Sequence, residues 1–158
     1  MTNSLDDAIA RIQVIALASA LSSTDRVLKS APDYPVENEE PLPCCISYLG
    51  GGEFNASNAS MHLNFPAINV EFHFSRTNLK LAHQDINAVA LSFPARLAGD
   101  PTLNGTVQTI LMTQDQPVPY AVRPFVWREK TQTMSAFVTQ SLTFTVPIKL
   151  LKTPTSTA

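Results

Sequence analysis

Hydrophobic residues recur at helical spacing within residues 77–112, and a helix here is the central element of the predicted fold. Thr77 or Asn78 can cap its first turn, because either side chain can accept a hydrogen bond from a backbone N–H that lacks a partner in the helix. The apolar face consists of Leu79, Ala82, Ile86, Val89 and Phe93. Polar residues, with Asp85 among them, occupy the other side, so we predict a helix that packs on a sheet along one stripe.

The C-terminal end of this helix is marked by Pro94. Proline has no backbone N–H and disfavours helical geometry at the residue before it, so we expect the helix to stop or kink at Phe93. At most one further turn then reaches Gly99, which suits a C-terminal cap. Turn residues follow, and the β-branched residues after them predict a strand over residues 106–111.

Alternating apolar and polar positions predict a strand over residues 68–74. Its even-numbered residues would face the core, whereas Glu71 and His73 would lie on a half-solvated face of an antiparallel sheet. The wider segment, residues 61–74, holds one or two strands around Pro66.

An earlier strand is predicted over residues 44–49, and three glycines, residues 50–52, are expected to end it. Residues 53–60 then form a loop or hairpin tip. The glycines lack the lysine and the following helix of a phosphate-binding loop, so we interpret them as part of a flexible hairpin.

Near the C-terminus, residues 120–129 and 134–148 predict two long strands of a hairpin. Pro124 removes a donor from the first strand, which indicates an edge position or a bulge. This hairpin has more aromatic and arginine character than a sheet requires, and such residues are common in protein–protein contacts. The candidate interface residues are Tyr120, Arg123, Phe125, Trp127 and Glu129. The alternative is that the tryptophan covers an edge of the core.

The N-terminal segment predicts a helix that Ser4 can cap. Its apolar positions extend so far around the helix that Ile15 falls outside the main stripe. One side would face the sheet and another a neighbouring subunit, although a deeply buried helix would show the same pattern.

Together these elements predict an α+β fold, in which a mostly antiparallel sheet packs against an N-terminal helix and a long central helix, with a long C-terminal β-hairpin. The 158 residues fit a single domain covering residues 1–158. We expect residues 1–4 and 151–158 to be frayed.

Charge and hydropathy exclude some classes of function. The formal net charge of −2 provides no general basic field, so we expect no direct, sequence-specific nucleic-acid binding. No apolar run reaches the roughly 18 residues of a membrane span. The acidic start, MTNSLDD, does not have the basic character of a secretory signal, so we expect the protein to stay in the cell that makes it.

No catalytic pattern is present in the sequence. His62, His73 and His83 do not have the spacing of a metal site, and no G-x-S-x-G motif occurs. Cys44 and Cys45 are adjacent, which makes a disulfide between them geometrically difficult, so we interpret both as small hydrophobic residues. We therefore expect no enzyme activity, no cofactor and no metal.

Several stretches resemble the tail terminator proteins of long-tailed bacteriophages, which close the head-proximal end of the tail tube. The stretches that carry this resemblance are LDDAIARIQVIALAS, LPCCISYLGGGEF, VEFHFSRTNLKLAHQDINAV, LAGDPTLNGTVQTI and LTFTVPIKL. They span nearly the whole chain and are similar in pattern rather than as one rigid motif. Pro94 and the sparse charge of the last hairpin depart from the family pattern.

The resemblance implies a structural virion protein of the tail and neck, assembled in the host cytoplasm. Such proteins form a hexameric ring that stacks on the tail tube protein, stops its polymerisation and meets the head-side connector protein. By this resemblance, subunit contacts would lie on residues 120–129 and on the first helix, including Ile15. The loop at residues 49–60, including Gly51 and Phe54, would reach an adjacent ring.

Two alternatives remain open. Another phage neck protein, such as a head–tail connector or a tail-completion adaptor, also forms rings from small domains. A non-catalytic ligand-binding β-rich module would instead use Trp127 and Tyr120 to stack on a sugar or ring.

Overall fold

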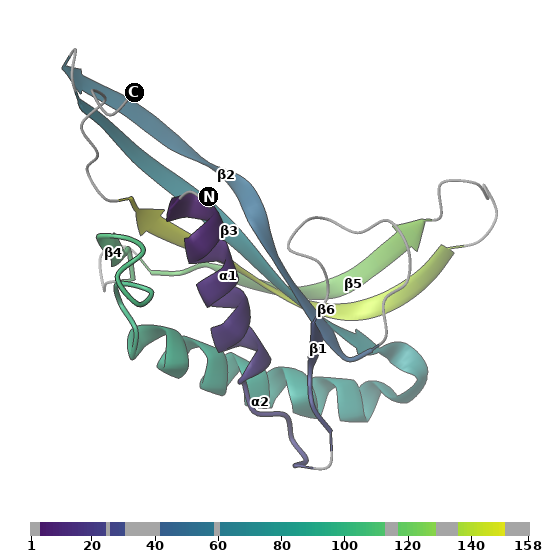
Figure 1. Ribbon diagram of the computed structural model, residues 1–158. Helices are drawn as coiled ribbons and strands as arrows, with labels where there is room; N and C mark the ends of the chain where they lie inside the picture. The colour runs from purple at the N-terminus through teal and green to yellow at the C-terminus, as the bar shows by residue number, and fades with distance from the viewer. Residues whose placement is uncertain are drawn as a thin grey trace.

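The computed structural model describes residues 4–24, 26–30, 42–58, 61–112, 117–128 and 136–150. This part of the chain folds into two α-helices and a mostly antiparallel sheet, which confirms the predicted α+β class (Figure 1). The elements in chain order are α1 (Ser4–Leu17), β1 (Lys29–Ser30), β2 (Cys44–Asn58), β3 (Met61–Ser75), a 3₁₀ turn η1 (Arg76–Asn78), α2 (Leu79–Ala98), β4 (Thr109–Ile110), β5 (Tyr120–Arg128) and β6 (Ala136–Lys149).

The strand order of the sheet is β1-β2-β3-β6-β4, and β5 also pairs with β6. Strands β4 and β5 both pair with the same edge of β6. Strand β5 pairs with residues 136–144 of β6, and β4 pairs with residues 148 and 149. Only the short β1–β2 pair is parallel. The predicted C-terminal hairpin is confirmed as β5–β6, with Tyr120 opposite Phe144.

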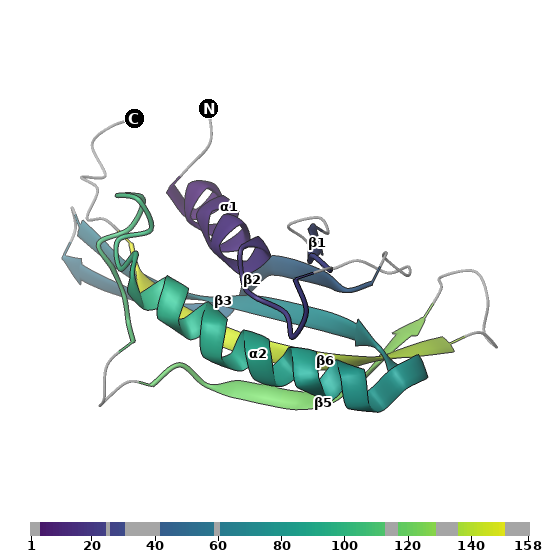
Figure 2. The same ribbon diagram turned by 90° about the horizontal axis from the view of Figure 1, so that it is seen from below.

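Both helices pack on the same face of the sheet (Figure 2). Alternate residues of β3 and β6 point toward the helices, and the buried members on these strands are Ile68, Val70, Phe72, Phe74, Leu142, Phe144, Val146 and Ile148. Phe93 of α2 packs its ring against Phe72 and Phe144, with ring centroids 5.4 Å and 5.0 Å away. Helix α1 packs mainly over β2, and α2 packs over β3 and β6.

Helix α2 differs from its prediction at Pro94. The helix runs through this proline to Ala98, so of the two predicted outcomes, a stop or a kink at Phe93, the stop is wrong, whereas the further turn is confirmed. Its start was predicted well, since Asn78 accepts a hydrogen bond from the N–H of Leu81 at 3.2 Å. Gly99 caps the other end, with its N–H 3.2 Å from the carbonyl oxygen of Ala95.

Strand β2 is much longer than predicted. It continues through the three glycines to Asn58 and pairs with β3 throughout, with a register irregularity between Leu49 and Gly51. Gly52 has φ +150°, a conformation that glycine adopts without steric cost, so one glycine changes the strand's path without ending it. The loop predicted at residues 53–60 is therefore wrong for residues 53–58, whereas the predicted hairpin is confirmed by the pairing of β2 with β3.

Strand β3 is one continuous strand through Pro66, whereas residues 106–111 contain only the two-residue β4. The β2–β3 pair extends beyond the rest of the sheet (Figure 1). Its pairing runs from Cys44 opposite His73 to Asn58 opposite Met61, but β6 joins β3 only from Ala67 onward. We call the two-stranded extension, residues 51–58 and 61–66, the arm.

Three prolines, Pro66, Pro124 and Pro147, lie inside the described strands, and none of them removes a hydrogen bond between β3 and the strands on either side of it. Pro147 accepts a hydrogen bond from the N–H of Leu111 at 2.8 Å, so its backbone groups face β4 and not β3. The N–H of Thr145 donates to Pro119 at 3.0 Å. This bond shows that the backbone of Pro119 faces β6. Because backbone groups alternate in direction along a strand, Pro124, five residues later, directs its nitrogen to the outer edge of β5. The predicted edge position of Pro124 is thereby confirmed.

The same alternation applies to Pro66. Its neighbour Ala67 lies opposite Pro147 in a pair whose backbone groups point apart, so Ala67 faces β2 and Pro66 faces the opposite side. No β2–β3 hydrogen bond is lost. Of the segments expected to be frayed, residues 1–3 and 151–158 lie outside the described chain, and Ser4 is the first residue of α1.

Candidate functional site

The predicted interface residues of β5 are divided between the two faces of the sheet. Tyr120 is 65% exposed on the side that carries the helices, and Val122 beside it is 42% exposed. Arg123 and Phe125, which are two residues apart in the strand, both lie on the opposite side. Arg123 is exposed, whereas Phe125 is half-buried.

Two further candidates on this hairpin are described only in part. Trp127 lies in β5 opposite Phe137, but its side chain lies outside the described part of the structure, as does the whole of Glu129. The choice between a tryptophan at an interface and one at a core edge therefore stays a prediction.

An apolar groove of about 440 Å³ lies between α2 and the start of β5. Helix α2 covers β3 and β6 but does not extend over β5, so the helix-facing side of β5 remains open here. The residues that line the groove include Leu91, Pro94, Met112, Val118, Tyr120 and Phe144. Leu91 is 79% exposed, and the ring of Tyr120 lies 5.8 Å from that of Phe144. The groove can accept an apolar side chain or ligand.

On the opposite face of the sheet, polar residues form a buried network. The ring of His73 contacts the Glu71 carboxylate through Nε2 at 2.9 Å and the Thr139 hydroxyl through Nδ1 at 2.8 Å. Tyr48 donates its hydroxyl hydrogen to the same carboxylate. His73 and Thr139 have no exposed surface and Glu71 is 6% exposed. The prediction that this face of β3 is half-solvated is wrong at Glu71 and His73.

The network also includes a predicted interface residue. The ring of Phe125 meets that of His73 edge-on, with centroids 5.0 Å apart. Burial opposes ionisation of Glu71, but the hydrogen bonds from His73 and Tyr48 outweigh it and lower the pKa of this carboxyl group. Burial and the neighbouring Glu71 raise the pKa of Tyr48 to about 12. The arrangement keeps Glu71 ionised and holds β2, β3 and β6 in register.

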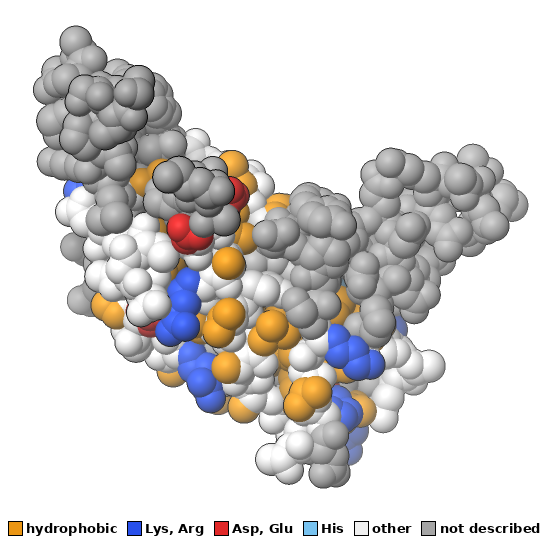
Figure 3. Space-filling view, viewed as in Figure 1, with side chains coloured by type: hydrophobic (Ala, Val, Ile, Leu, Met, Phe, Trp, Pro, Cys, Tyr) orange, Lys and Arg blue, Asp and Glu red, His pale blue; other side chains and the backbone are white. Residues whose placement is uncertain are grey.

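Helix α1 is neither buried on all sides nor exposed at its predicted contact residue. Ile15 is buried in the core and only 6% exposed, so its side chain has little surface for a partner. The surface of the helix instead includes Ala10 and Val14, and Ala18 directly after the helix continues their four-residue spacing; Val14 is 54% exposed. Figure 3 shows hydrophobic side chains scattered over the face of the molecule on which α1 lies.

The remaining predicted residues lie on the arm. Gly51 is exposed, and a Cβ atom added there would meet no other atom within 4 Å. Phe54 lies in β2 opposite Asn64, but its side chain lies outside the described part of the structure. The structure thus places the described candidates on three separate elements: the β5 strand, α1 and the arm.

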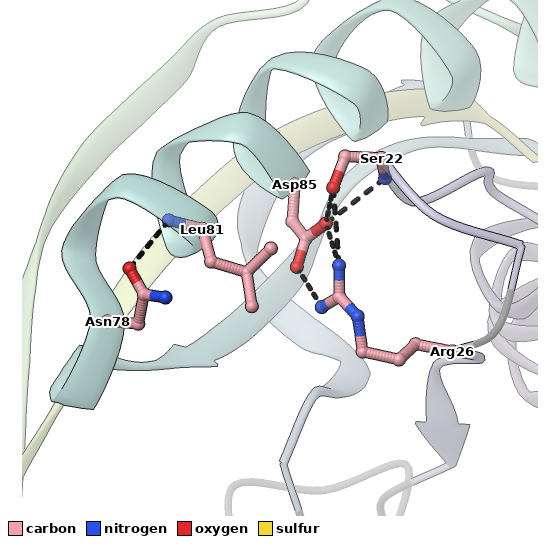
Figure 4. A network of polar contacts seen from close by, with 5 residues as sticks. All are labelled: Ser22, Arg26, Asn78, Leu81 and Asp85. Carbon is pink, nitrogen blue, oxygen red and sulfur yellow. Dashed lines mark hydrogen bonds and ion pairs between the residues drawn. The ribbon is translucent and has the colours of Figure 1, made fainter.

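A second ionic network was not predicted. Asp85 lies on the buried side of α2, where its carboxylate accepts hydrogen bonds from Ser22 and from both terminal nitrogens of Arg26 (Figure 4). Burial opposes ionisation, but these hydrogen bonds prevail and lower the pKa of Asp85. The sequence held one signal, because residue 85 adjoins the apolar stripe at positions 82, 86 and 89, and a carboxylate there needs a partner.

Within the described ranges, no group of three or more His, Cys, Asp or Glu side chains is arranged to hold a metal ion. Neither of the described helices has the length and apolar character required to cross a membrane. No model of a known protein family matches the chain, and a search of curated proteins also finds no match.

Proposed function

We propose that this protein is a structural virion protein that forms a ring, a hexamer by the family resemblance, at the head-proximal end of a bacteriophage tail tube. In this role it ends polymerisation of the tail tube protein and joins the tail to the head-side connector protein. It works by assembly and needs no catalytic residue, cofactor, membrane or nucleic acid. Its location is the tail and neck of the virion, after assembly in the host cytoplasm.

One observation supports this proposal best: two different apolar surfaces lie toward opposite edges of the same sheet. Val14 on α1 lies on the β2 side, and Tyr120 and Val122 lie on β5 at the other edge. A closed ring needs two unlike surfaces on each subunit that bind head to tail. Exposed aromatic and aliphatic side chains at both surfaces suit such contacts.

The order of the elements also supports the proposal. The chain has, in order, a helix, a glycine-containing hairpin, a long helix and a C-terminal hairpin. The segments that resemble tail terminators follow the same order. The arm extends beyond the sheet and would be free to meet an adjacent ring. A neighbouring neck role would use the same surfaces, and the protein on which the ring stacks distinguishes the two roles.

The ring is tested by light scattering after size-exclusion chromatography and by negative-stain images of the protein mixed with tail tubes. We expect rings, and we expect them at tube ends. Val14→Glu and Val122→Glu place a charge on each of the two surfaces and should reduce the assembled mass. Gln84→Glu, at an exposed position of α2 outside both surfaces, is the matched control and should leave the assembled mass unchanged. A strictly monomeric protein that also fails to bind tube ends would contradict the proposal.

The groove beside Tyr120 favours a second candidate, a ligand-binding β-rich module. Its volume of about 440 Å³ is within the range of small-molecule sites. Intrinsic tryptophan fluorescence against a panel of sugars and aromatic compounds tests it. A fluorescence change on addition of a compound, lost in Leu91→Asp, would support the ligand-binding module over the ring. No fluorescence change with any compound would count against the ligand-binding module.

A further inference from the structure

The outer edge of β2 is the side that faces away from β3. Strand β1 pairs with it only at Cys44 and Cys45, and no other strand of the described chain pairs with it. Two hydrogen bonds identify this side: the N–H of Lys29 donates to the Pro43 carbonyl, and Gln13 Nε2 donates to the Cys45 carbonyl at 2.8 Å. The backbone groups of β2 from residue 47 onward therefore have no strand partner on this side within the described ranges.

Backbone N–H and C=O groups of successive strand residues point to opposite sides, and this alternation shows which residues of the arm contribute to the outer edge of β2. Ala67 directs its backbone groups toward β2, as established above, and it lies opposite Gly51. Gly51 therefore faces β3. Gly52 then faces outward, and so do Phe54 and Ala56, which follow Gly52 at every second position. Their N–H and C=O groups point away from the arm.

This edge lacks the features that normally protect a free strand. Proteins block exposed edges with proline, lysine or other inward charges, and short strands. β2 has 15 residues with no proline, lysine or arginine, and Glu53 is its only charged residue. By contrast, Pro124 removes a donor from the outer edge of β5, and Pro66 does the same on the other edge of the arm.

The arm also needs a third strand for stability. A two-stranded ribbon in water is marginally stable, and independent stability generally requires a further strand or a packed layer. β6 ends its pairing with β3 at Ala67, so it does not reach the arm. A strand added to β2 would extend the sheet alongside the segment that β6 leaves uncovered.

We propose that the outer edge of β2 pairs antiparallel with the outer edge of β2 in a second copy of this chain, around a two-fold axis. The pairing is self-complementary, because each copy offers the same proline-free row of donors and acceptors. The β5 edge of another copy would be a poorer partner, since Pro124 leaves one acceptor opposite it without a donor. This contact uses the backbone edge of β2, whereas the proposed ring uses exposed side chains of α1 and β5, so the contact does not depend on that function.

Hydrogen exchange on the wild-type full-length chain gives the first test. The backbone N–H groups of Phe54 and Ala56 should exchange slowly at high protein concentration and at least about tenfold faster at a concentration where the copies separate. Equal exchange rates at all concentrations would overturn the proposal. Protection that appears only after addition of isolated tail tubes would also overturn it, because the edge would then belong to another protein.

A pair of proline variants gives the second test. Ala56→Pro removes an outward donor of β2 and leaves the bonds to β3 intact, so it should raise the dissociation constant for β2 pairing at least about tenfold. Val122→Pro removes an outward donor of β5 and should leave this pairing unchanged. Sedimentation velocity measures both, and circular dichroism verifies that each variant is folded. If folded Ala56→Pro associates like the wild type, the proposed β2 pairing is wrong. Loss of the ring in Val122→Glu concerns the proposed function and does not contradict the β2 pairing.

Discussion

Arg26 and Asp85 form an ion pair that fastens the segment after α1 to the buried side of α2 (Figure 4). The side chain of Asp85 is 2% exposed, and that of Arg26 is 30% exposed. Because the two partners differ in burial, the two single substitutions should differ in cost. This asymmetry distinguishes an ion pair that stabilises the fold from a contact that merely forms on its surface.

Arg26→Gln should lower the free energy of unfolding by about 3 kcal/mol, because it leaves a buried carboxylate without its cation. Asp85→Asn should cost less, about 1 to 2 kcal/mol, because the freed guanidinium group can turn toward water. Urea unfolding at pH 7 measures both. Equal losses for the two variants, or no loss for Arg26→Gln, would contradict this account.

The sequence predicted the elements better than it predicted their limits. The apolar stripe of α2 and the apolar–polar alternation of β3 and β6 were strong sequence signals, because each pattern repeats over several helical turns or several pairs of strand residues. A stop at Pro94 was wrong because the lost hydrogen bond and the steric clash that a proline causes are local, and burial of Leu97 in the turn after it offsets their cost. The end of β2 was wrong because glycine weakens a strand without terminating it when a paired partner continues alongside.

Gly52 should be the least replaceable residue of the arm. Its φ of +150° disfavours any side chain, and an added Cβ would lie 2.6 Å from the Cα of Pro66. Gly52→Ala should therefore lower stability by about 2 kcal/mol or disrupt the pairing beyond it. Gly51→Ala is the matched control, because a Cβ there meets nothing within 4 Å. Thermal unfolding of the two variants should separate them, and equal melting temperatures would contradict the assigned backbone conformation.

Cys44 and Cys45 should be chemically inert in the folded protein. Both thiols are fully buried and neither forms a disulfide, and burial together with the neighbouring Cys44 raises the pKa of Cys45 to about 12. The reactive thiolate form of Cys45 is therefore rare at pH 8, and burial keeps reagents away from both sulfur atoms. We expect mass spectrometry to show no alkylation after brief iodoacetamide treatment of the folded chain, and two additions in urea. Rapid labelling of the folded chain would show that β2 opens readily.

The candidate site was harder to predict than the fold, because each of its features depends on contacts that sequence periodicity does not carry. Alternation placed Arg123 and Phe125 together, but it could not show that the same face buries His73 against Phe125. Helical spacing identified the wide apolar face of α1, but only packing shows that Ile15 points inward and Val14 outward. Polar residues on a strand predict a solvated face only where nothing covers that face.

The network around Glu71 should make stability depend on pH in acid. The folded-state pKa of Glu71 lies below its ordinary value of 4.5, so the ionised carboxylate contributes its full stabilisation above pH 4.5. That stabilisation is lost as the pH falls through the lower, folded-state value. Glu71→Gln removes the ionisable group, so it should cost about 1 to 3 kcal/mol at pH 7 and progressively less toward pH 2.

Tyr48→Phe tests the same mechanism from the other side of the carboxylate. It removes one hydrogen bond to Glu71 and retains the aromatic ring, so the pKa of Glu71 should rise toward its ordinary value. The cost at pH 7 should be about 1 kcal/mol, smaller than that of Glu71→Gln. Urea unfolding of the wild type and both variants between pH 7 and pH 2 measures the convergence. If the gap between wild type and Glu71→Gln stays constant over this range, ionisation of Glu71 does not stabilise the fold, and the network acts through shape alone.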